Sequence, residues 1–280
     1  MRTMIWPLAA VVSLALAGCN SSGSSSQQAA APAPVAHSVS GTVTIRGNDQ
    51  PSANDKLTIS LVDVSQQGAA PLATKTIAPA TTFPLSFELD FSPSDVVAHD
   101  LYVVKAELVD GDRKYEMPLQ APVLTKNNPT TNVSIQLVPQ QTPGEKELAA
   151  FKSVQEQLGA MQIRNGTKLE KDVSYAWQVF RQNDQVQFIR ARADRGKKGF
   201  TNTDFAFKAG KPWVVVQQQK TDQNAKPTSI ERAGWADDGT LVLKQDVVGG
   251  KVSPLSADEA SSLKQQALDM LKMVTGGKGK

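Results

Sequence analysis

The sequence predicts an all-β sandwich over residues 39–138, followed by an α+β domain over residues 139–280 in which helices flank an antiparallel β-meander. Three observations support this fold class. Apolar and polar residues alternate in short segments of the first half, as in strands with one buried face. A proline-containing break follows at residues 139–144. Beyond it, two segments with helical spacing enclose a second series of alternating segments.

The first 18 residues have the composition of a secretion signal peptide. Arg2 gives a positively charged start, and an apolar run over residues 5–17 ends just before Cys19. The run is shorter than the roughly 20 apolar residues that span a bilayer. The segment resembles the bacterial lipobox, at which the cysteine is acylated, with palmitate among its acyl chains, and the chain is cut just before it. The lipobox residues are Leu16, Ala17 and Gly18.

The alternative is an ordinary signal cleaved at an Ala-x-Ala site, with Cys19 incidental. Cys19 is the only cysteine and directly follows the apolar segment, which favours lipidation. No cysteine then remains for a disulfide, a metal site or a nucleophile. Each buried acyl methylene contributes about 0.8 kcal/mol, so two or three chains hold the protein at a membrane. Asn20 replaces the aspartate that signals inner-membrane retention, which favours the periplasmic face of the outer membrane.

Residues 19–38 are rich in Ser, Gln, Ala and Pro, and this composition predicts a flexible tether. From Val39 the sequence period changes to two. The clearest alternation places Phe and Leu at every second position of residues 83–91. The other predicted strands of the sandwich are residues 39–45, 57–61, 101–109, 113–117 and 133–137, with a hairpin turn at Asp110-Gly111-Asp112.

The second domain is predicted to begin with a helix. Thr142 is its cap, Pro143 its first residue and Glu145 its capping-box partner, and Gly159 or Asn165-Gly166 ends it. About five strands follow within residues 175–247, with a basic loop at residues 195–199. A second helix begins after Ser256, has Glu259 at its capping-box position, and extends to Val274.

Four segments of the sandwich, residues 39–45, 57–64, 83–89 and 102–108, resemble the YbaY/YscW lipoprotein family, which includes type III secretion pilotin lipoproteins. The resemblance covers residues 38–138 and implies a small β-sandwich on a lipid anchor. In the pilotin branch it implies an apolar groove that receives a helical tail of an outer-membrane secretin. Residues 144–280 depart from the family, and no binding residue is assigned from it.

The residue inventory argues against catalysis. The two histidines, His37 in the tether and His99 in a loop, have no nucleophile or carboxylate evidently placed around them. No spacing of ligands suggests a metal site, and no glycine-rich motif suggests a nucleotide or other cofactor. Asp237 and Asp238 can be interpreted as paired carboxylates, but Gly239 after them favours a hairpin. We therefore predict no catalytic residue, no metal and no cofactor.

Two further groups have alternative interpretations. A basic segment fits either an anionic partner or a solvated strand and loop, and acidic neighbours favour the second. Three tryptophans form either a ligand-binding surface or part of the core, and their place in the alternation favours the core. The basic residues are Arg190, Arg192, Arg195, Lys197 and Lys198; the tryptophans are Trp177, Trp213 and Trp235.

The sequence thus predicts an outer-membrane-anchored periplasmic lipoprotein that acts as a non-catalytic binding or assembly module, similar to a pilotin, for an envelope protein. A formal net charge of only +3, from 30 basic and 27 acidic residues, argues against a nucleic-acid partner. The alternative is an envelope inhibitor or ligand-binding protein that acts through the C-terminal α+β domain. A groove on the sandwich favours the first hypothesis, and a deep pocket lined by the tryptophans favours the second.

The lipid anchor is directly testable. Because Cys19 is the only thiol, Cys19→Ala is expected to abolish acyl labelling and to remove the protein from washed membranes. The measurement is metabolic labelling with a fatty acid followed by membrane fractionation. Wild-type protein that is soluble and carries no label would contradict the prediction.

Overall fold

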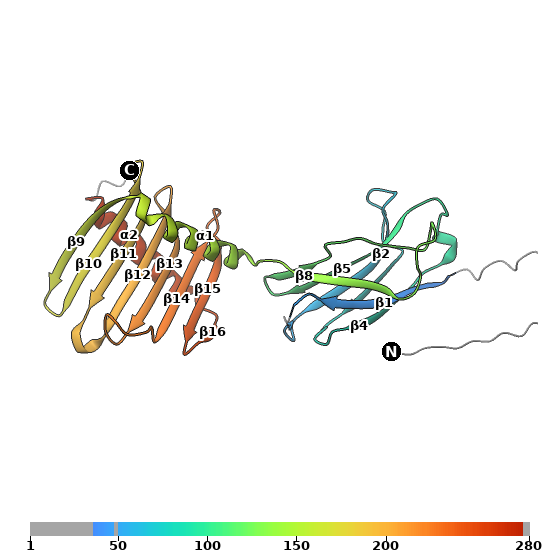
Figure 1. Ribbon diagram of the computed structural model, residues 1–280, viewed down its shortest axis with the longest axis horizontal. Coiled ribbons are helices and arrows are strands. Elements are labelled where there is room, and N and C mark those ends of the chain that lie inside the picture. Colours follow the sequence, from blue (N-terminus) through green and yellow to red (C-terminus); the bar gives the residue numbers. More distant parts are fainter. Residues whose placement is uncertain (1–35, 48–49, 277–280) are drawn as a thin grey trace, which may run out of the picture. The chain divides into compact units, whose positions relative to one another are not determined.

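The computed structural model describes residues 36–47 and 50–276. The predicted signal peptide, Cys19 and most of the predicted tether lie outside these residues. The described residues form a β-sandwich and a larger sheet with two α-helices, which confirms the predicted fold class (Figure 1). Within the described residues, no helix is long and apolar enough to cross a bilayer.

The sandwich has two sheets. One sheet has the order β4-β1-β8, in which β1 and β8 are parallel. The other has the order β3-β2-β5, with β6 and β7 both pairing with the far edge of β5, and a short β6–β8 contact joins the two sheets. The strands are β1 (Ser38–Ile45), β2 (Lys56–Asp63), β3 (Ala73–Ile77), β4 (Leu85–Asp90), β5 (Tyr102–Asp110), β6 (Arg113–Glu116), β7 (Ala121–Val123) and β8 (Val133–Pro139).

The alternating residues of these strands supply one core. Leu57, Ile59 and Leu61 on β2 are fully buried, and Val104 and Leu108 on β5 face the same interior. The outward residues between them are polar or partly exposed, as the sequence pattern predicts. At the parallel contact, a Cβ on Gly41 would overlap the carbonyl oxygen of Val133, so a glycine lets β1 approach β8.

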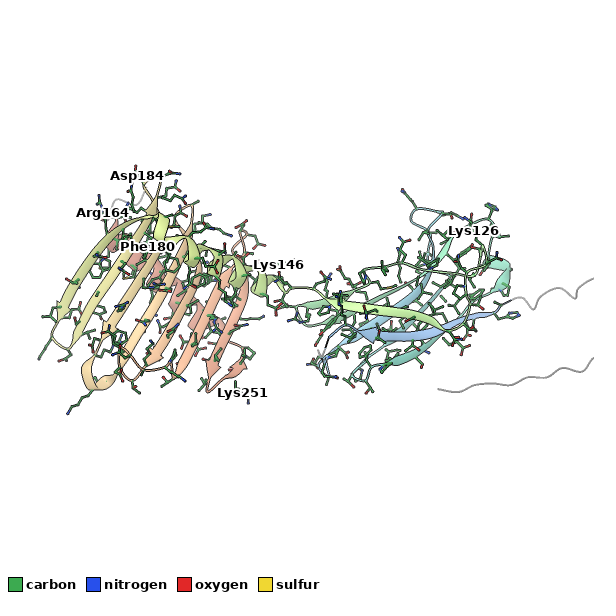
Figure 2. All side chains as sticks on the ribbon, in the orientation of Figure 1. Lys126, Lys146, Arg164, Phe180, Asp184 and Lys251 are labelled. Atoms are coloured by element: carbon green, nitrogen blue, oxygen red, sulfur yellow. The ribbon has the colours of Figure 1, made fainter. Side chains whose placement is uncertain are left out.

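The second part is an eight-stranded sheet in which each strand pairs only with its neighbours in the sequence, all antiparallel. Its edges are β9 and β16, and the labelled side chains Arg164 and Lys251 mark these two edges (Figure 2). The elements are α1 (Pro143–Gln157), β9 (Gln162–Glu170), β10 (Val173–Gln182), β11 (Gln185–Asp194), β12 (Phe200–Lys208), β13 (Lys211–Lys220), β14 (Ser229–Trp235), β15 (Leu241–Val248), β16 (Lys251–Ser253) and α2 (Ala257–Val274).

The two helices cover opposite faces of this sheet (Figure 1). Phe151 of α1 packs on Phe188, with a ring-centroid separation of 5.6 Å, while Leu263 of α2 belongs to the cluster that contains Ile189. Since Phe188 and Ile189 are neighbours on β11, they point to opposite faces. The central strands are therefore buried on both sides, and the result is a helix–sheet–helix sandwich of three layers.

Both predicted helix starts are confirmed. The Thr142 hydroxyl accepts a hydrogen bond from the Glu145 N–H at 3.1 Å, and the Ser256 hydroxyl accepts one from the Glu259 N–H at 3.2 Å. In each case the glutamate side chain accepts a hydrogen bond from the backbone N–H of the cap residue, which completes the capping box.

The prediction of about five strands was too low. Strand β9 was missed because its residues are nearly all exposed and show no apolar alternation. Asn165-Gly166, proposed as a possible end of the first helix, lies inside β9 instead. The Trp177 ring occupies the space where a side chain at Gly166 would lie, so packing and not a turn explains this glycine. Strands β7 and β16 were missed because each has only three residues, and β3 was missed because its central residues, 74–76, are polar and exposed.

We propose that the sandwich and the helix–sheet–helix part are independent domains. The core cluster of the sandwich shares no residue with the two clusters that pack on the larger sheet. Fragments 38–139 and 142–280 are therefore expected to unfold separately and cooperatively in urea, and limited proteolysis is expected to cut between Pro139 and Gly144. If neither fragment shows a cooperative transition, the halves share a core and the proposal is wrong.

Candidate functional site

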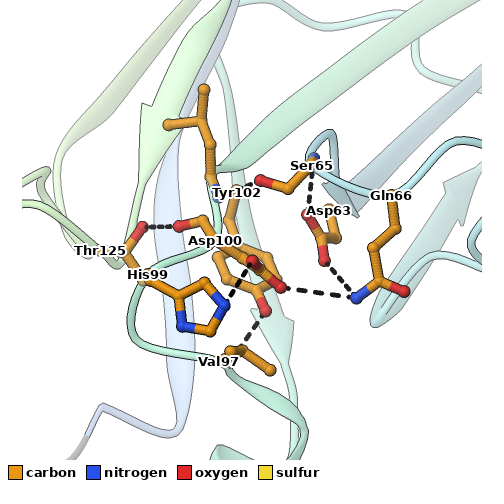
Figure 3. Close-up of polar contacts among 9 residues, drawn as sticks. Asp63, Ser65, Gln66, Val97, His99, Asp100, Tyr102 and Thr125 are labelled. Atoms are coloured by element: carbon orange, nitrogen blue, oxygen red, sulfur yellow. Dashed lines mark hydrogen bonds and ion pairs between the residues drawn. The ribbon is translucent and has the colours of Figure 1, made fainter.

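His99 lies in the loop before β5, as expected, and its side chain is 85% exposed. Its Nε2 atom is 3.5 Å from the Asp100 carboxylate (Figure 3). The nearby Ser65 hydroxyl is engaged elsewhere, because it accepts a hydrogen bond from the Leu101 N–H at 2.8 Å. Histidine, carboxylate and hydroxyl therefore do not form a catalytic triad.

The buried carboxylates beside His99 hold loops together. Asp63 accepts a hydrogen bond from the Ser65 N–H at 2.8 Å, and the Gln66 amide bridges Asp63 and Asp100 (Figure 3). Thr125 donates to the Asp100 carbonyl at 2.6 Å. These contacts satisfy polar groups at one end of the sandwich. Among the described residues, no three acidic, histidine or cysteine side chains are placed to hold a metal ion.

The other candidates from the sequence have structural roles. Asp237 and Asp238 lie in the hairpin between β14 and β15, where Gly239 has a φ of 89°. The Asp238 carboxylate accepts a hydrogen bond from the Thr240 N–H at 2.9 Å, which lowers the pKa of Asp238. This confirms the hairpin interpretation over a catalytic carboxylate pair.

The basic segment does not form one patch. Arg190 makes a two-pronged ion pair with Asp204, at 2.9 and 3.2 Å, and this hydrogen bonding raises the pKa of Arg190. Arg195 instead donates to the Thr201 hydroxyl at 2.8 Å. Lys197 and Lys198 are exposed in the short turn that follows.

The three tryptophans do not form one surface. Trp213 is 5% exposed in the cluster beneath α1, whereas Trp235 is 6% exposed in the cluster beneath α2. Trp177 packs against the second of these clusters. Core packing is confirmed for Trp213 and Trp235, and a shared aromatic ligand surface is excluded.

The sandwich carries a groove beside β5. Strand β6 pairs with Glu107–Asp110 and β7 with Tyr102–Val104, so Lys105 and Ala106 face no strand on this edge. Residues 117–120 connect β6 to β7. These four residues lie opposite only two residues of β5, Lys105 and Ala106, so the connection leaves the sheet. Here the Ala106 N–H contacts the Met117 sulfur at 3.0 Å. A gap in strand pairing therefore creates the groove.

The groove encloses about 640 Å³ and combines apolar and charged groups. Leu119 is 79% exposed at its rim, which is unusual for a large apolar side chain. The lining residues are Thr58, Ser60, Val103, Val104, Lys105, Ala106, Glu107, Glu116, Met117, Pro118, Leu119 and Gln120. Such a site can hold a short amphipathic segment, with apolar contacts at its centre and charges at its edges.

This site was not predicted from the sequence, because only a strand over residues 113–117 was expected and the next three residues were assigned no role. Pro118 was the available signal, since proline cannot donate a backbone hydrogen bond to a neighbouring strand.

Comparisons with known proteins concern this sandwich. Residues 34–137 match the family model for the type III secretion system lipoprotein chaperone YscW, which confirms the resemblance predicted from the sequence. Among solved structures, an alternative pilotin from the type II secretion system of Vibrio cholerae matches with 25% sequence identity and a TM-score of 0.34. That match covers 37% of this chain and 96% of the pilotin. No curated protein matches the chain.

Three carboxylates also gather on the larger sheet, away from the groove. Glu231 on β14 lies directly opposite Asp246 on β15, and Glu259 is at the start of α2. Burial raises the pKa of Glu231, and the charges of Glu259 and Asp246 raise it further. Glu231 therefore keeps its proton to a higher pH in the folded chain than in the unfolded chain.

Glu231→Gln is expected to stabilise the protein at pH 7. A raised folded-state pKa means that stability falls as the pH rises from the unfolded value of about 4.3 through the folded value. The gain is therefore expected to be present at pH 7 and to disappear near pH 4, measured by urea unfolding. The exposed Glu156→Gln is the control, with a change within about 0.5 kcal/mol. An equal effect of both variants would contradict the assignment.

Proposed function

We propose that this protein is a lipid-anchored, non-catalytic assembly module of the pilotin kind, which holds a segment of a secretion-apparatus or other envelope protein in the groove beside β5. The observation that carries the proposal is the position of the groove. Its lining residues, from Thr58 to Gln120, lie within the segment that matches the secretion lipoprotein chaperone family.

The groove offers two kinds of contact to such a segment. Leu119, Pro118 and Met117 supply apolar surface, which contributes about 25 cal/mol per Å² buried, less the cost of ordering the captured segment. Lys105 and Glu107 add charged groups, which can pair with polar or charged side chains of the segment. An amphipathic helix can use the apolar surface alone.

The charges around the groove favour one orientation of the bound segment. Lys105, Glu107 and Glu116 line the groove, and Glu107 is 3.7 Å from Lys114. Charged groups at the edge of an interface contribute more to orientation and association rate than to affinity. We therefore expect a partner segment with an apolar centre and charges of both signs at its ends.

The proposed location depends on the N-terminal segment. Acylation of Cys19 would fix the protein at the periplasmic face of the outer membrane, and residues 20–37 would let the sandwich reach a partner away from the lipid surface. A binding role needs no cofactor and no catalytic group. The exposed His99 and the engaged Ser65 and Asp63 are consistent with this role.

Site-specific photocrosslinking in intact cells tests the proposed groove. A photoreactive residue replacing Lys105 is expected to capture discrete envelope proteins, and adding Leu119→Asp is expected to reduce capture at least fivefold by placing a charge in the apolar contact. Because Leu119 is 79% exposed, its substitution is expected to leave the unfolding free energy unchanged within about 0.5 kcal/mol.

The matched control uses Leu169 on β9, which is 83% exposed on the other sheet. Leu169→Asp is expected to leave capture at position 105 unchanged. A photoreactive residue at position 169 that captures the same proteins while position 105 captures none would contradict the proposal.

A further inference from the structure

A hollow lies on the larger sheet beside the C-terminal half of α2. In the central row of residues under α2, Ile189, Phe205 and Val215 fill the space. In the next rows, Ala191 and Ala193 take the corresponding places on β11. These small side chains, next to larger neighbours, leave a cavity of about 430 Å³.

The floor of the hollow is a continuous chain of hydrogen-bonded side chains. Arg195 donates to the Thr201 hydroxyl at 2.8 Å, and Thr201 donates to the side-chain amide oxygen of Gln219 at 3.0 Å. Gln219 donates to Gln217 at 3.0 Å, and Gln217 donates to Thr203 at 3.3 Å. Gln217 also reaches Gln266 of α2 at 3.1 Å, so the chain connects the sheet to the helix.

The buried threonines of this polar chain stand out in strands whose buried residues are mostly hydrophobic. Thr201 and Thr203 are each 6% exposed, although most buried residues of β10–β13 are hydrophobic. Their hydroxyls are fixed by the network, so the floor is ordered before a ligand arrives. Binding to a preorganised polar floor avoids the cost of ordering these groups.

The chain of hydrogen-bonded side chains starts at Arg195, a cation that has no acidic partner within ion-pair distance among the described residues. Among the described residues, no carboxylate lies within ion-pair distance of Arg195, whereas Arg190 on the same strand is paired with Asp204. A partly buried guanidinium beside a cavity is a strong donor for a carboxylate, which accepts two parallel hydrogen bonds from it.

The walls of the hollow are mainly apolar, although Arg192 and Asp269 also line it, and the Asp269 carboxylate accepts a hydrogen bond from the Gln265 side chain at 3.0 Å. Met270 and Met273 of α2 lie on one side, and Ala191, Ala193 and Phe205 line the sheet. Methionine side chains adapt to apolar chains of varied shape. From Thr201 to Phe205 the hollow follows five residues of an extended strand, a distance of about 13 Å. Its volume is within the range of small-molecule sites, roughly 300–1,000 Å³.

We propose that this hollow binds an organic monocarboxylate with an unbranched apolar tail, whose carboxylate pairs with Arg195 and whose tail lies against Ala193, Met270 and Met273. The site is separate from the groove beside β5 and does not depend on the proposed function. It assigns a binding role to the domain that the family match does not reach.

The test is calorimetric titration of the full chain carrying Cys19→Ala, so that no acyl group of the protein competes. Decanoate is expected to bind at least tenfold more tightly than decanol, because only decanoate pairs with Arg195. Acetate, which lacks the tail, is expected not to bind. Equal affinities for decanoate and decanol, or no heat with millimolar decanoate, would overturn the proposal.

Variants locate the binding. Arg195→Gln is expected to weaken decanoate about tenfold while leaving decanol unchanged. Lys197→Gln makes the same charge change two residues away, in the exposed turn, and is expected to have no effect. Ala193→Leu fills the hollow without changing its charge and is expected to abolish binding of both probes.

A second measurement covers the case in which Arg195→Gln disturbs the fold. Decanoate is expected to shift the backbone amide NMR signals of Thr201 and Thr203 in the parent chain, and not those of Leu119 on the sandwich. Shifts confined to the sandwich would place the ligand elsewhere and overturn the proposal.

Discussion

The larger sheet is governed by one constraint: a strand covered by helices on both faces must present apolar residues on both faces. Strands β11, β12 and β13 meet it at their centres, where Phe188 and Ile189, or Val214 and Val215, point to opposite sides. Both helices depend on this double apolar surface, because a helix of 15 or 18 residues gains most of its stability from packing. The sandwich strands need only one apolar face, and their sequences alternate accordingly.

The two candidate sites arise where such regular coverage stops. Beside β5, two short strands share one long edge, and the unpaired middle opens a groove. Beside α2, the helix leaves part of the sheet face uncovered, and alanines and hydrogen-bonded polar residues replace the bulky apolar side chains. One site thus results from missing strand pairing and the other from missing helix coverage. The groove therefore lies beside a gap in strand pairing, whereas the floor of the hollow is made of side chains.

Sequence reasoning succeeded where a local pattern carries the structure. Thr142 and Ser256 identified both helix starts, and the alternation of residues 83–91 identified β4. It failed for β9, whose exposed residues have no apolar face, and for the interpretation of Gly166, whose reason is the Trp177 ring on the next strand. Neither site was visible in advance. The groove depends on which strands share β5, and the hollow depends on side chains from five separate elements.

The parallel pairing of β1 with β8 has a consequence for how the sandwich is made. Val43 lies opposite Ile135, so the first strand acquires this neighbour only after nearly the whole domain is available. Contacts between residues so far apart in the sequence slow folding, because a long loop must close before the pairing stabilises it. While the chain emerges, one edge of β1 stays open and its apolar face is covered only in part. The sandwich is therefore most prone to aggregation before Val133–Pro139 has been delivered, whether the chain leaves a ribosome or an export channel.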